Sequence, residues 1–261
     1  MKILVAGAAG FIGSNLSSHL LQTTAHTVIS VDDLSGTPDL DNLQFALGHR
    51  NNRHKFYLLN IADSIMLNRL IRIEKPDIII NAARSAQQGV NLNESLYSEA
   101  CKYKTQLFIS LEDTGLTSQN DVKAITLTIG SVFGPRQGPK CEIPKIINSV
   151  LNDLVIENLP TEEADFLYIK DLLDAICLLI EADSLASDYH HIGGTICTFE
   201  NIENYLKLLV GGLPANLIAI DSDMTSSPQI LSLGWKVRRP LDQALEHTLQ
   251  WYNLNKWAFN N

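Results

Sequence analysis

The sequence predicts an α/β protein, with a Rossmann-type, doubly wound parallel sheet and a small C-terminal α/β lobe. Three observations lead to this fold class. Short apolar runs alternate with segments of helical period, which favours parallel strands joined by right-handed crossovers. A glycine triplet, Gly7, Gly10 and Gly13, separates the first apolar run from the first helical segment. After Pro139 the alternation loosens, but no low-complexity linker divides the chain.

The expected strands are short and rich in β-branched residues. They are residues 2–6, 27–31, 55–59, 77–81, 106–110 and 124–129. The expected helices carry apolar residues at helical spacing, and they are residues 12–22, 65–74, 92–103, 143–151, 169–182, 199–210 and 240–251. We therefore expect a sheet domain over residues 1–139, completed by segments near 165–195, and a smaller lobe over residues 140–261.

Composition and charge exclude several classes of function. The chain has 261 residues and a formal net charge of −9, and its Lys and Arg residues do not cluster beyond Arg238 and Arg239. A nucleic-acid partner is therefore not expected. No apolar stretch reaches the length of about 18 residues that a membrane span requires. The cysteines are scattered and the histidines lack ligand spacing, so we expect reduced thiols, no metal and a cytoplasmic protein.

The glycine triplet predicts a dinucleotide site. The first glycine permits a tight turn, the second lets a pyrophosphate approach the backbone, and the third lets helix and strand pack closely. Asp32 follows about twenty residues later, where a carboxylate accepts a hydrogen bond from an adenosine ribose and repels a 2′-phosphate. NAD is therefore favoured over NADP. Two alternatives stay open: the glycines serve only a turn, and Asp32 only initiates a loop.

Further motifs follow in order along the chain. They are VDDLSG (31–36), LLNIAD (58–63), INAAR (80–84), VNLNES (90–95), SVFGPRQGP (131–139), ADFLYIKD (164–171), LGW (233–235) and WY (251–252). Together with the glycines they resemble the extended short-chain dehydrogenase/reductase family, specifically its NAD-dependent nucleotide-sugar epimerases and dehydratases. The resemblance implies a nucleotide sugar as substrate, capped by the smaller lobe.

The resemblance also implies which residues hold the cofactor. In the family an Asp meets the adenine amino group, and here Asn60 stands in its place and offers its carbonyl oxygen. The alanines of INAAR would line the dinucleotide. The cofactor-binding residues implied are Gly7, Gly10, Phe11, Ile12, Gly13, Asp32, Asp33, Ser35, Asn60, Ile61, Ala82 and Ala83.

The catalytic pair of that family is the main departure. Its members carry Tyr-x-x-x-Lys on a helix after the fifth strand, and the Lys lowers the pKa of a Tyr that acts as general base. In this chain only YNLNK, Tyr252 to Lys256, has that spacing, and it lies after the LGW segment. The helix that bears the base is therefore expected to be deleted between Ser110 and the SVFGPRQGP stretch.

Other positions depart in the same direction. Ser110 matches the first hydroxyl at the end of strand five and is a weak catalytic candidate, but Leu111 stands where the second belongs. Thr128 and Ala164 replace arginines, while Arg136 remains; each loss removes a charge-assisted contact to a phosphate. Nearby residues that lie close to the strand ends in sequence, but to which we assign no catalytic role, are Tyr103, Lys104, Glu112, Asp113 and Lys123.

We expect a NAD-binding member of the family that is catalytically impaired or acts as a non-catalytic accessory subunit. The alternative is an active nucleotide-sugar epimerase or 4,6-dehydratase that uses a non-standard base, and a decayed gene product is a third interpretation. Family members commonly dimerise through a bundle that includes the missing helix. We therefore expect a monomer, with residues 112–123 folded over the gap, or an oligomer with a different interface.

Overall fold

The computed structural model describes residues 1–35, 42, 52–84, 91–111, 121–156, 158–182, 189–221 and 226–259. The chain divides into two compact units. The first comprises Met1–Thr128 and Leu179–His190, and the second comprises Ile129–Leu178 and His191–Asn261. The expected boundary at residue 139 stays a prediction.

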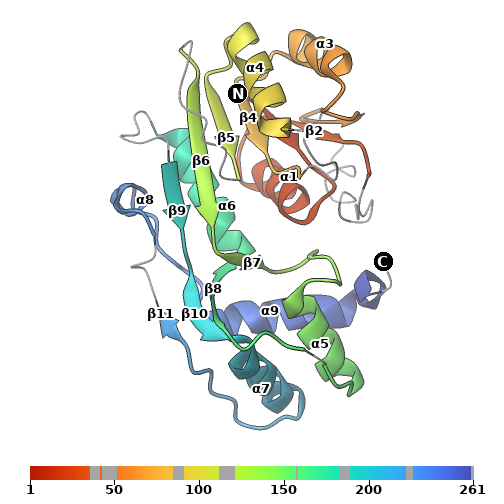
Figure 1. Cartoon of the computed structure of the whole chain (residues 1–261), viewed down its shortest axis with the longest axis vertical. Helices are drawn as coiled ribbons and strands as arrows, with labels where there is room; N and C mark the ends of the chain where they lie inside the picture. Colours follow the sequence, from red (N-terminus) through yellow and green to blue (C-terminus); the bar gives the residue numbers. More distant parts are fainter. Residues whose placement is uncertain are drawn as a thin grey trace. The chain divides into compact units, whose positions relative to one another are not determined.

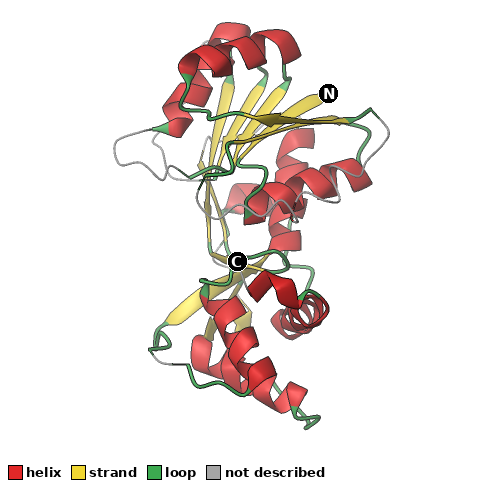
Figure 2. Ribbon diagram, turned by 90° about the vertical axis from the view of Figure 1, so that its right-hand side faces the viewer, coloured by secondary structure: helices red, strands yellow, loops and turns green. Residues whose placement is uncertain are grey.

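The first unit contains most of a seven-stranded sheet with the order β3-β2-β1-β4-β5-β6-β9 (Figure 1). Adjacent strands from β3 to β6 pair in parallel. Figure 2 shows helices on both faces of this sheet. The strands are β1 (Lys2–Ala6), β2 (Thr27–Asp32), β3 (His54–Leu58), β4 (Ile78–Asn81), β5 (Leu107–Ser110), β6 (Lys123–Ile129) and β9 (Tyr189–Ile192). The helices are α1 (Phe11–Thr23), α3 (Ser64–Glu74) and α4 (Leu92–Tyr103). The fold class expected from the sequence is confirmed.

Local sequence fixes where these helices begin and end. The side chain of Asp63 caps α3 by accepting from the backbone N–H groups of Ile65 and Met66, and Asn91 caps α4 through Glu94. The carboxyl end of α1 is held differently. The guanidinium of Arg53 donates to the backbone carbonyls of Leu21, Thr24 and His26. These carbonyls have no partner inside the helix, so Arg53 supplies one.

One face of the sheet packs against α3 and α4 and forms a continuous core. Leu4, Ile29, Ile79 and Phe108 from the strands share this core with residues of both helices. Ser30 faces the opposite way from Ile29. Its hydroxyl contacts the hydroxyl of Ser17 on α1 and the ring of His54. Side-chain alternation along β2 therefore separates an apolar α3–α4 face from a face with buried polar contacts.

The second unit is built on a four-stranded sheet with the order β11-β10-β8-β7. Its strands are β7 (Ser131–Phe133), β8 (Glu163–Tyr168), β10 (Thr195–Thr198) and β11 (Ile220–Asp221). Its helices are α5 (Glu142–Asn152), α7 (Phe199–Val210), α8 (Pro228–Ser232) and α9 (Leu241–Leu254), with a final 3-10 turn at Lys256–Phe259. Helix α6 (Ile169–Glu181) begins in this unit and ends in the first.

Most expected elements occur within one or two residues of their predicted bounds, and the short strands of the second unit were not predicted. The expected cover over residues 112–123 lies, apart from residues 121–123, outside the described part of the chain. Within the described ranges, no helix has both the length and the apolar character to span a bilayer. The described residues also contain no group of three His, Cys, Asp or Glu side chains able to hold a metal.

Candidate functional site

The three glycines of the first loop occupy their positions for different structural reasons. Gly7 has a positive φ of 73°, and a Cβ there would lie 2.6 Å from the Cα of Ala83. A Cβ on Gly13 would lie 2.1 Å from the carbonyl oxygen of Gly7. At Gly10 the nearest atom would be that same oxygen, at 3.3 Å. Packing within the chain thus requires Gly7 and Gly13, whereas Gly10 leaves backbone open toward a ligand.

The amino end of α1 offers unpaired donors beside Gly10. Gly10 is the N-cap residue, no side chain caps the helix, and its first turn has no acidic residue. The first helical donor is the N–H of Ser14, bonded to the Gly10 carbonyl at 3.0 Å. The N–H groups of Phe11 and Ile12 precede it and have no acceptor inside the helix, and they lie at the positive end of the helix dipole. This arrangement suits a phosphate group.

Asp32 lies at the end of β2, bonded into this loop. Its Oδ2 accepts from the N–H of Ala9 at 2.8 Å, and its Oδ1 accepts from the N–H of Leu34 at 2.8 Å. Burial raises the pKa of Asp32, while these two backbone bonds oppose that rise. Each carboxylate oxygen accepts more than one hydrogen bond, so the carboxylate can still accept from a ribose hydroxyl.

The neighbouring residues of the expected site are held by short local bonds. Asp33 accepts from both the N–H and the hydroxyl of Ser35, at 2.9 and 2.6 Å. The side-chain oxygen of Asn60 accepts from the N–H of Ala62 at 2.8 Å, which leaves one lone pair for an adenine amino group. Ile61 is buried in the α3–α4 core rather than exposed in the loop.

The end of β4 completes the group. The N–H of Ala82 bonds to the carbonyl of Ala6, and that of Ala83 bonds to the side chain of Asn81. Ala83 is also the residue that a Cβ on Gly7 would strike. The structure therefore brings the glycine loop, Asp32 and the two alanines together where the carboxyl ends of β1, β2 and β4 meet. In open α/β sheets, this carboxyl edge is where ligands bind.

A row of buried polar side chains crosses the next strands. Asn81, Ser110 and Thr126 are register partners on β4, β5 and β6, and each is at most 2% exposed. Ser110 lies two residues beyond Phe108, so the row continues on the face toward α4. Asn81 also donates to Asn93 of α4 at 2.7 Å. Sequence reasoning found Ser110 and missed Thr126, because its position beside Ser110 depends on strand register.

The tyrosines and lysines near strands five and six do not form a base at this edge. Tyr97 donates to the carbonyl of Val122 at 3.3 Å, which is at the amino end of β6. Tyr103 donates to Asn68 on α3. Lys104 follows the end of α4 and Lys123 opens β6, so both lie at the edge opposite to Ser110. Glu112 and Asp113 lie outside the described residues.

The only Tyr-x-x-x-Lys pair belongs to the second unit. Tyr252 is fully buried on α9, and its hydroxyl donates to the backbone carbonyl of Gln137. Burial raises the pKa of Tyr252 well above its usual value. Lys256 lies in the following 3-10 turn. A buried phenol held in this way is a packing element, and it is poorly suited to accept a proton.

The structure also describes the residues of the SVFGPRQGP and ADFLYIKD motifs, which lie in the second unit. Arg136 has a positive φ of 71°, and burial lowers the pKa of its guanidinium. Ala164 pairs with Cys197 in the sheet. Its neighbour Asp165 accepts from the N–H of Gly194 at 2.5 Å and approaches His191 at 3.8 Å. Thr128, in the first unit, donates to the carbonyl of His190 at 3.5 Å.

Comparison with protein families agrees with this geometry. The family model described as "NAD dependent epimerase/dehydratase family" matches residues 3–116 and 105–193. The chain belongs to the NAD dependent epimerase/dehydratase family. The family model matches in two pieces that overlap at residues 105–116, and this overlap includes Ser110, after which a deletion is expected.

Curated relatives in the family include two sugar-nucleotide dehydratases. A dTDP-D-glucose 4,6-dehydratase of Dictyostelium discoideum is 26% identical over 80% of this chain and 61% of that protein. A dTDP-glucose 4,6-dehydratase of Escherichia coli is 25% identical over 98% of this chain and 94% of its own length. The latter alignment spans 350 positions, although this chain has 261 residues. At least 89 positions of the alignment, 350 less 261, therefore have no residue of this chain.

Solved structures of the family share the fold. The dTDP-glucose 4,6-dehydratase of Bacillus anthracis, solved in complex with NAD, has a TM-score of 0.82 at 20% identity and covers 100% of this chain and 99% of its own. The UDP-glucose 4-epimerase of Thermotoga maritima, solved with UDP-glucose, has a TM-score of 0.80 at 20% identity, covering 98% of this chain and 100% of its own.

Proposed function

We propose that this chain binds NAD through its adenosine half and no longer performs the hydride cycle of its family, acting instead as an accessory member. One observation carries the proposal. The only Tyr-x-x-x-Lys pair has its tyrosyl oxygen buried against the carbonyl of Gln137, while the dinucleotide loop keeps its open glycine at Gly10.

The residues present fit the adenosine and pyrophosphate parts of the cofactor. Gly10 and the N–H groups of Phe11 and Ile12 would hold the pyrophosphate, and Asp32 would accept from the ribose. Ala82 and Ala83 would lie against the dinucleotide. The carboxylate of Asp32 repels a 2′-phosphate, which favours NAD over NADP. Bound NAD supplies a hydride acceptor, as in the enzymes of the family.

The first unit contains no Tyr-x-x-x-Lys sequence to serve the reaction half. Oxidising a sugar hydroxyl requires a group that takes its proton, with a pKa brought near the working pH. In the described part of the first unit, the hydroxyls of Tyr57, Tyr97 and Tyr103 are bonded to Glu74, Val122 and Asn68. Ser110 and Thr126 provide neighbouring hydroxyls on β5 and β6. The two-piece family match supports the absence of the helix that would carry the base.

The alternative is an active epimerase or 4,6-dehydratase with a non-standard base. The identity of the curated relatives favours it, since several of them are dTDP-glucose 4,6-dehydratases. An assay separates the two functions. The protein is incubated with NAD and either UDP-glucose or dTDP-glucose in deuterated water. We expect no 4-keto sugar, no C4 epimer of the supplied sugar and no deuterium in recovered sugar. Turnover that disappears in a Gly10→Trp variant would establish the enzyme.

The surface of α4 bears on assembly. Asn91, Glu94, Ser98 and Lys102 are all exposed and lie along one stripe of the helix. A helix that packs in a dimer bundle presents apolar residues on such a stripe. We infer that this chain does not dimerise through α4. Sedimentation of the purified chain should show a monomer, or an oligomer that Ser98→Trp leaves intact. Dissociation by Ser98→Trp would contradict the inference.

A further inference from the structure

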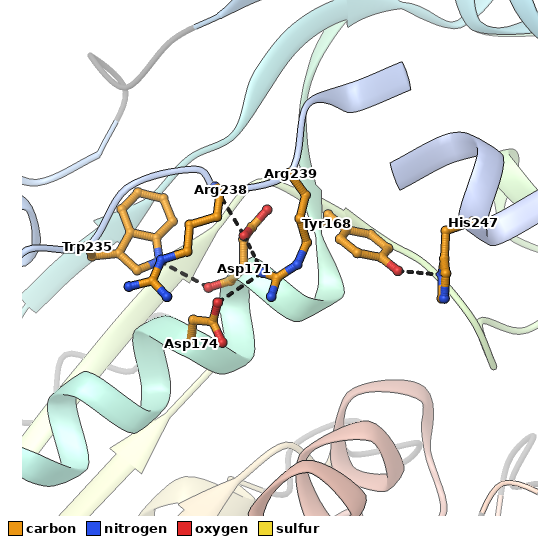
Figure 3. A network of polar contacts seen from close by, with 7 residues as sticks. All are labelled: Tyr168, Asp171, Asp174, Trp235, Arg238, Arg239 and His247. Carbon is orange, nitrogen blue, oxygen red and sulfur yellow. Dashed lines mark hydrogen bonds and ion pairs between the residues drawn. The ribbon is translucent and has the colours of Figure 1, made fainter. Parts of the chain in front are cut away.

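The second unit contains a polar junction between the start of α6 and residues 235–239, which we call the strap (Figure 3). The indole N–H of Trp235 donates to the backbone carbonyl of Asp171 at 3.0 Å. The N–H of Arg238 and the guanidinium of Arg239 both donate to Oδ1 of Asp171, at 3.3 and 2.6 Å. Arg239 also reaches Asp174 at 2.9 Å. Backbone and side chain of Asp171 thus anchor the strap.

The second oxygen of Asp171 is left over. The side chain of Asp171 is 1% exposed, and its Oδ2 has no hydrogen-bond partner in the described part of the chain. A buried carboxylate oxygen without a donor is costly, and buried polar groups nearly always have a partner. Asp171 also lines a small recess. The unpaired oxygen and the recess are independent observations at one place.

The lining of the recess does not provide the missing donor. Most of it is apolar, including Phe133, Phe166 and Leu241. The hydroxyl of Tyr168 is hydrogen-bonded to Nδ1 of His247, at 2.7 Å. Arg239, which also lines the recess, uses its guanidinium on the other carboxylate oxygen and on Asp174. The donor must therefore come from a molecule small enough to enter the recess.

We propose that the recess holds one ordered water molecule, which donates a hydrogen bond to Oδ2 of Asp171. The recess has a volume of about 10 Å³, which is about the size that holds a single water. Buried waters occur where a protein leaves polar atoms unpaired. A monovalent cation is disfavoured, because the guanidinium of Arg239 lies 2.6 Å from the other oxygen of the same carboxylate and would repel it. The water completes the hydrogen bonding of the junction and is part of what holds the strap on α6.

The proposal concerns the second unit alone, so it stands or falls independently of the proposed function. A crystal structure that resolves waters tests it directly. Wild-type protein should show one density peak about 2.8 Å from Oδ2 of Asp171. No protein N–H or O–H donor should lie within hydrogen-bond distance of that oxygen. An empty recess, or a protein donor bonded to Oδ2, would overturn the proposal.

Two further experiments sharpen the test. Asp174→Asn removes one of the two negative charges beside Arg239 but leaves Oδ2 of Asp171 unchanged, so the water should remain. Asp171→Leu removes the acceptor, so the water should be lost. If Asp171→Leu fails to fold, wild-type crystals soaked in thallium chloride still decide the occupant. Anomalous signal in the recess would identify a cation and contradict a water, and its absence with the peak retained supports the water.

Discussion

The carboxylate of Asp32 accepts a 2.8 Å hydrogen bond from the backbone N–H of Ala9. Ala9 lies inside the glycine loop and Asp32 at the end of the next strand. The group expected to bind a ribose is thus bonded directly to the loop expected to bind a pyrophosphate. Both parts of the adenosine half-site are organised by the chain itself, before any ligand arrives.

Replacement of Asp32 should weaken binding of both NAD and ADP. Asp32→Ala removes a charged acceptor for the ribose, and hydrogen bonds to charged groups contribute about 1.5–3 kcal/mol. We therefore expect the dissociation constant to rise roughly 10- to 100-fold. Glu200→Ala is the control, since it removes one negative charge at an exposed position on α7 in the second unit. Isothermal titration measures both, and equal effects of the two changes would argue against a ribose contact at Asp32.

Two glycine variants should behave in opposite ways. Gly10→Ala places a Cβ 3.3 Å from the Gly7 carbonyl oxygen, a tight contact that a shift of a few tenths of an ångström relieves, so the protein should fold with a slightly lowered melting temperature while losing affinity for ADP. Gly13→Ala places a Cβ 2.1 Å from the Gly7 carbonyl oxygen, so it should destabilise the fold. Thermal melts and ADP titration measure the pair. Unchanged ADP affinity in a folded Gly10→Ala protein would count against the phosphate site.

Because of the contact between Tyr57 and Glu74, the free energy of unfolding should fall as the pH rises into the alkaline range. Tyr57 donates to Glu74 at 2.5 Å, and this bond, with burial and the charge of Glu74, raises the pKa of Tyr57 from 10 to about 12. A raised pKa means that the folded state holds the proton more tightly. The contribution is therefore complete below pH 10 and is lost as pH rises through about 12.

Tyr57→Phe isolates that contribution. Below pH 10 the wild type should be more stable in urea by about 1 kcal/mol, and the difference should shrink between pH 10 and about 12. A difference that stays constant across this range would show that the hydrogen bond does not control the titration of Tyr57.

Arg53 should stabilise the first unit without contributing to ligand binding. Its guanidinium donates to three backbone carbonyls near the end of α1. Arg53→Met should leave those carbonyls to water and lower the free energy of unfolding by roughly 1–3 kcal/mol. Arg69→Met, on the exposed side of α3, serves as control and should change stability by less than about 0.5 kcal/mol. Similar losses in both variants would contradict the role of Arg53.

Much of the fold was predictable because its signals are local. The β-branched runs predicted β1, β2 and β4 within a residue, and the helix predicted over residues 199–210 has the bounds of α7. Pro240 was expected inside the last helix, and it instead precedes α9 as its N-cap. Its fixed φ suits either position, so a local pattern does not separate them.

The remaining features depend on contacts between distant residues. Thr126 meets Ser110 through the register of two strands, and Arg239 meets Asp171 across 68 positions of sequence. Neither partner is marked by its neighbours in the chain. The different roles of Gly7, Gly10 and Gly13 were expected from their spacing, and the coordinates add which backbone atoms a Cβ at each position would meet.

Calorimetric titration with ADP, NAD and NADH, each alone, tests the central claim most directly. If the adenosine half-site is intact and the reaction half-site is lost, ADP should bind and neither NAD nor NADH should bind more tightly than ADP. A gain of about tenfold or more from the nicotinamide half, about 1.4 kcal/mol, would contradict this account, as would a failure of all three to bind.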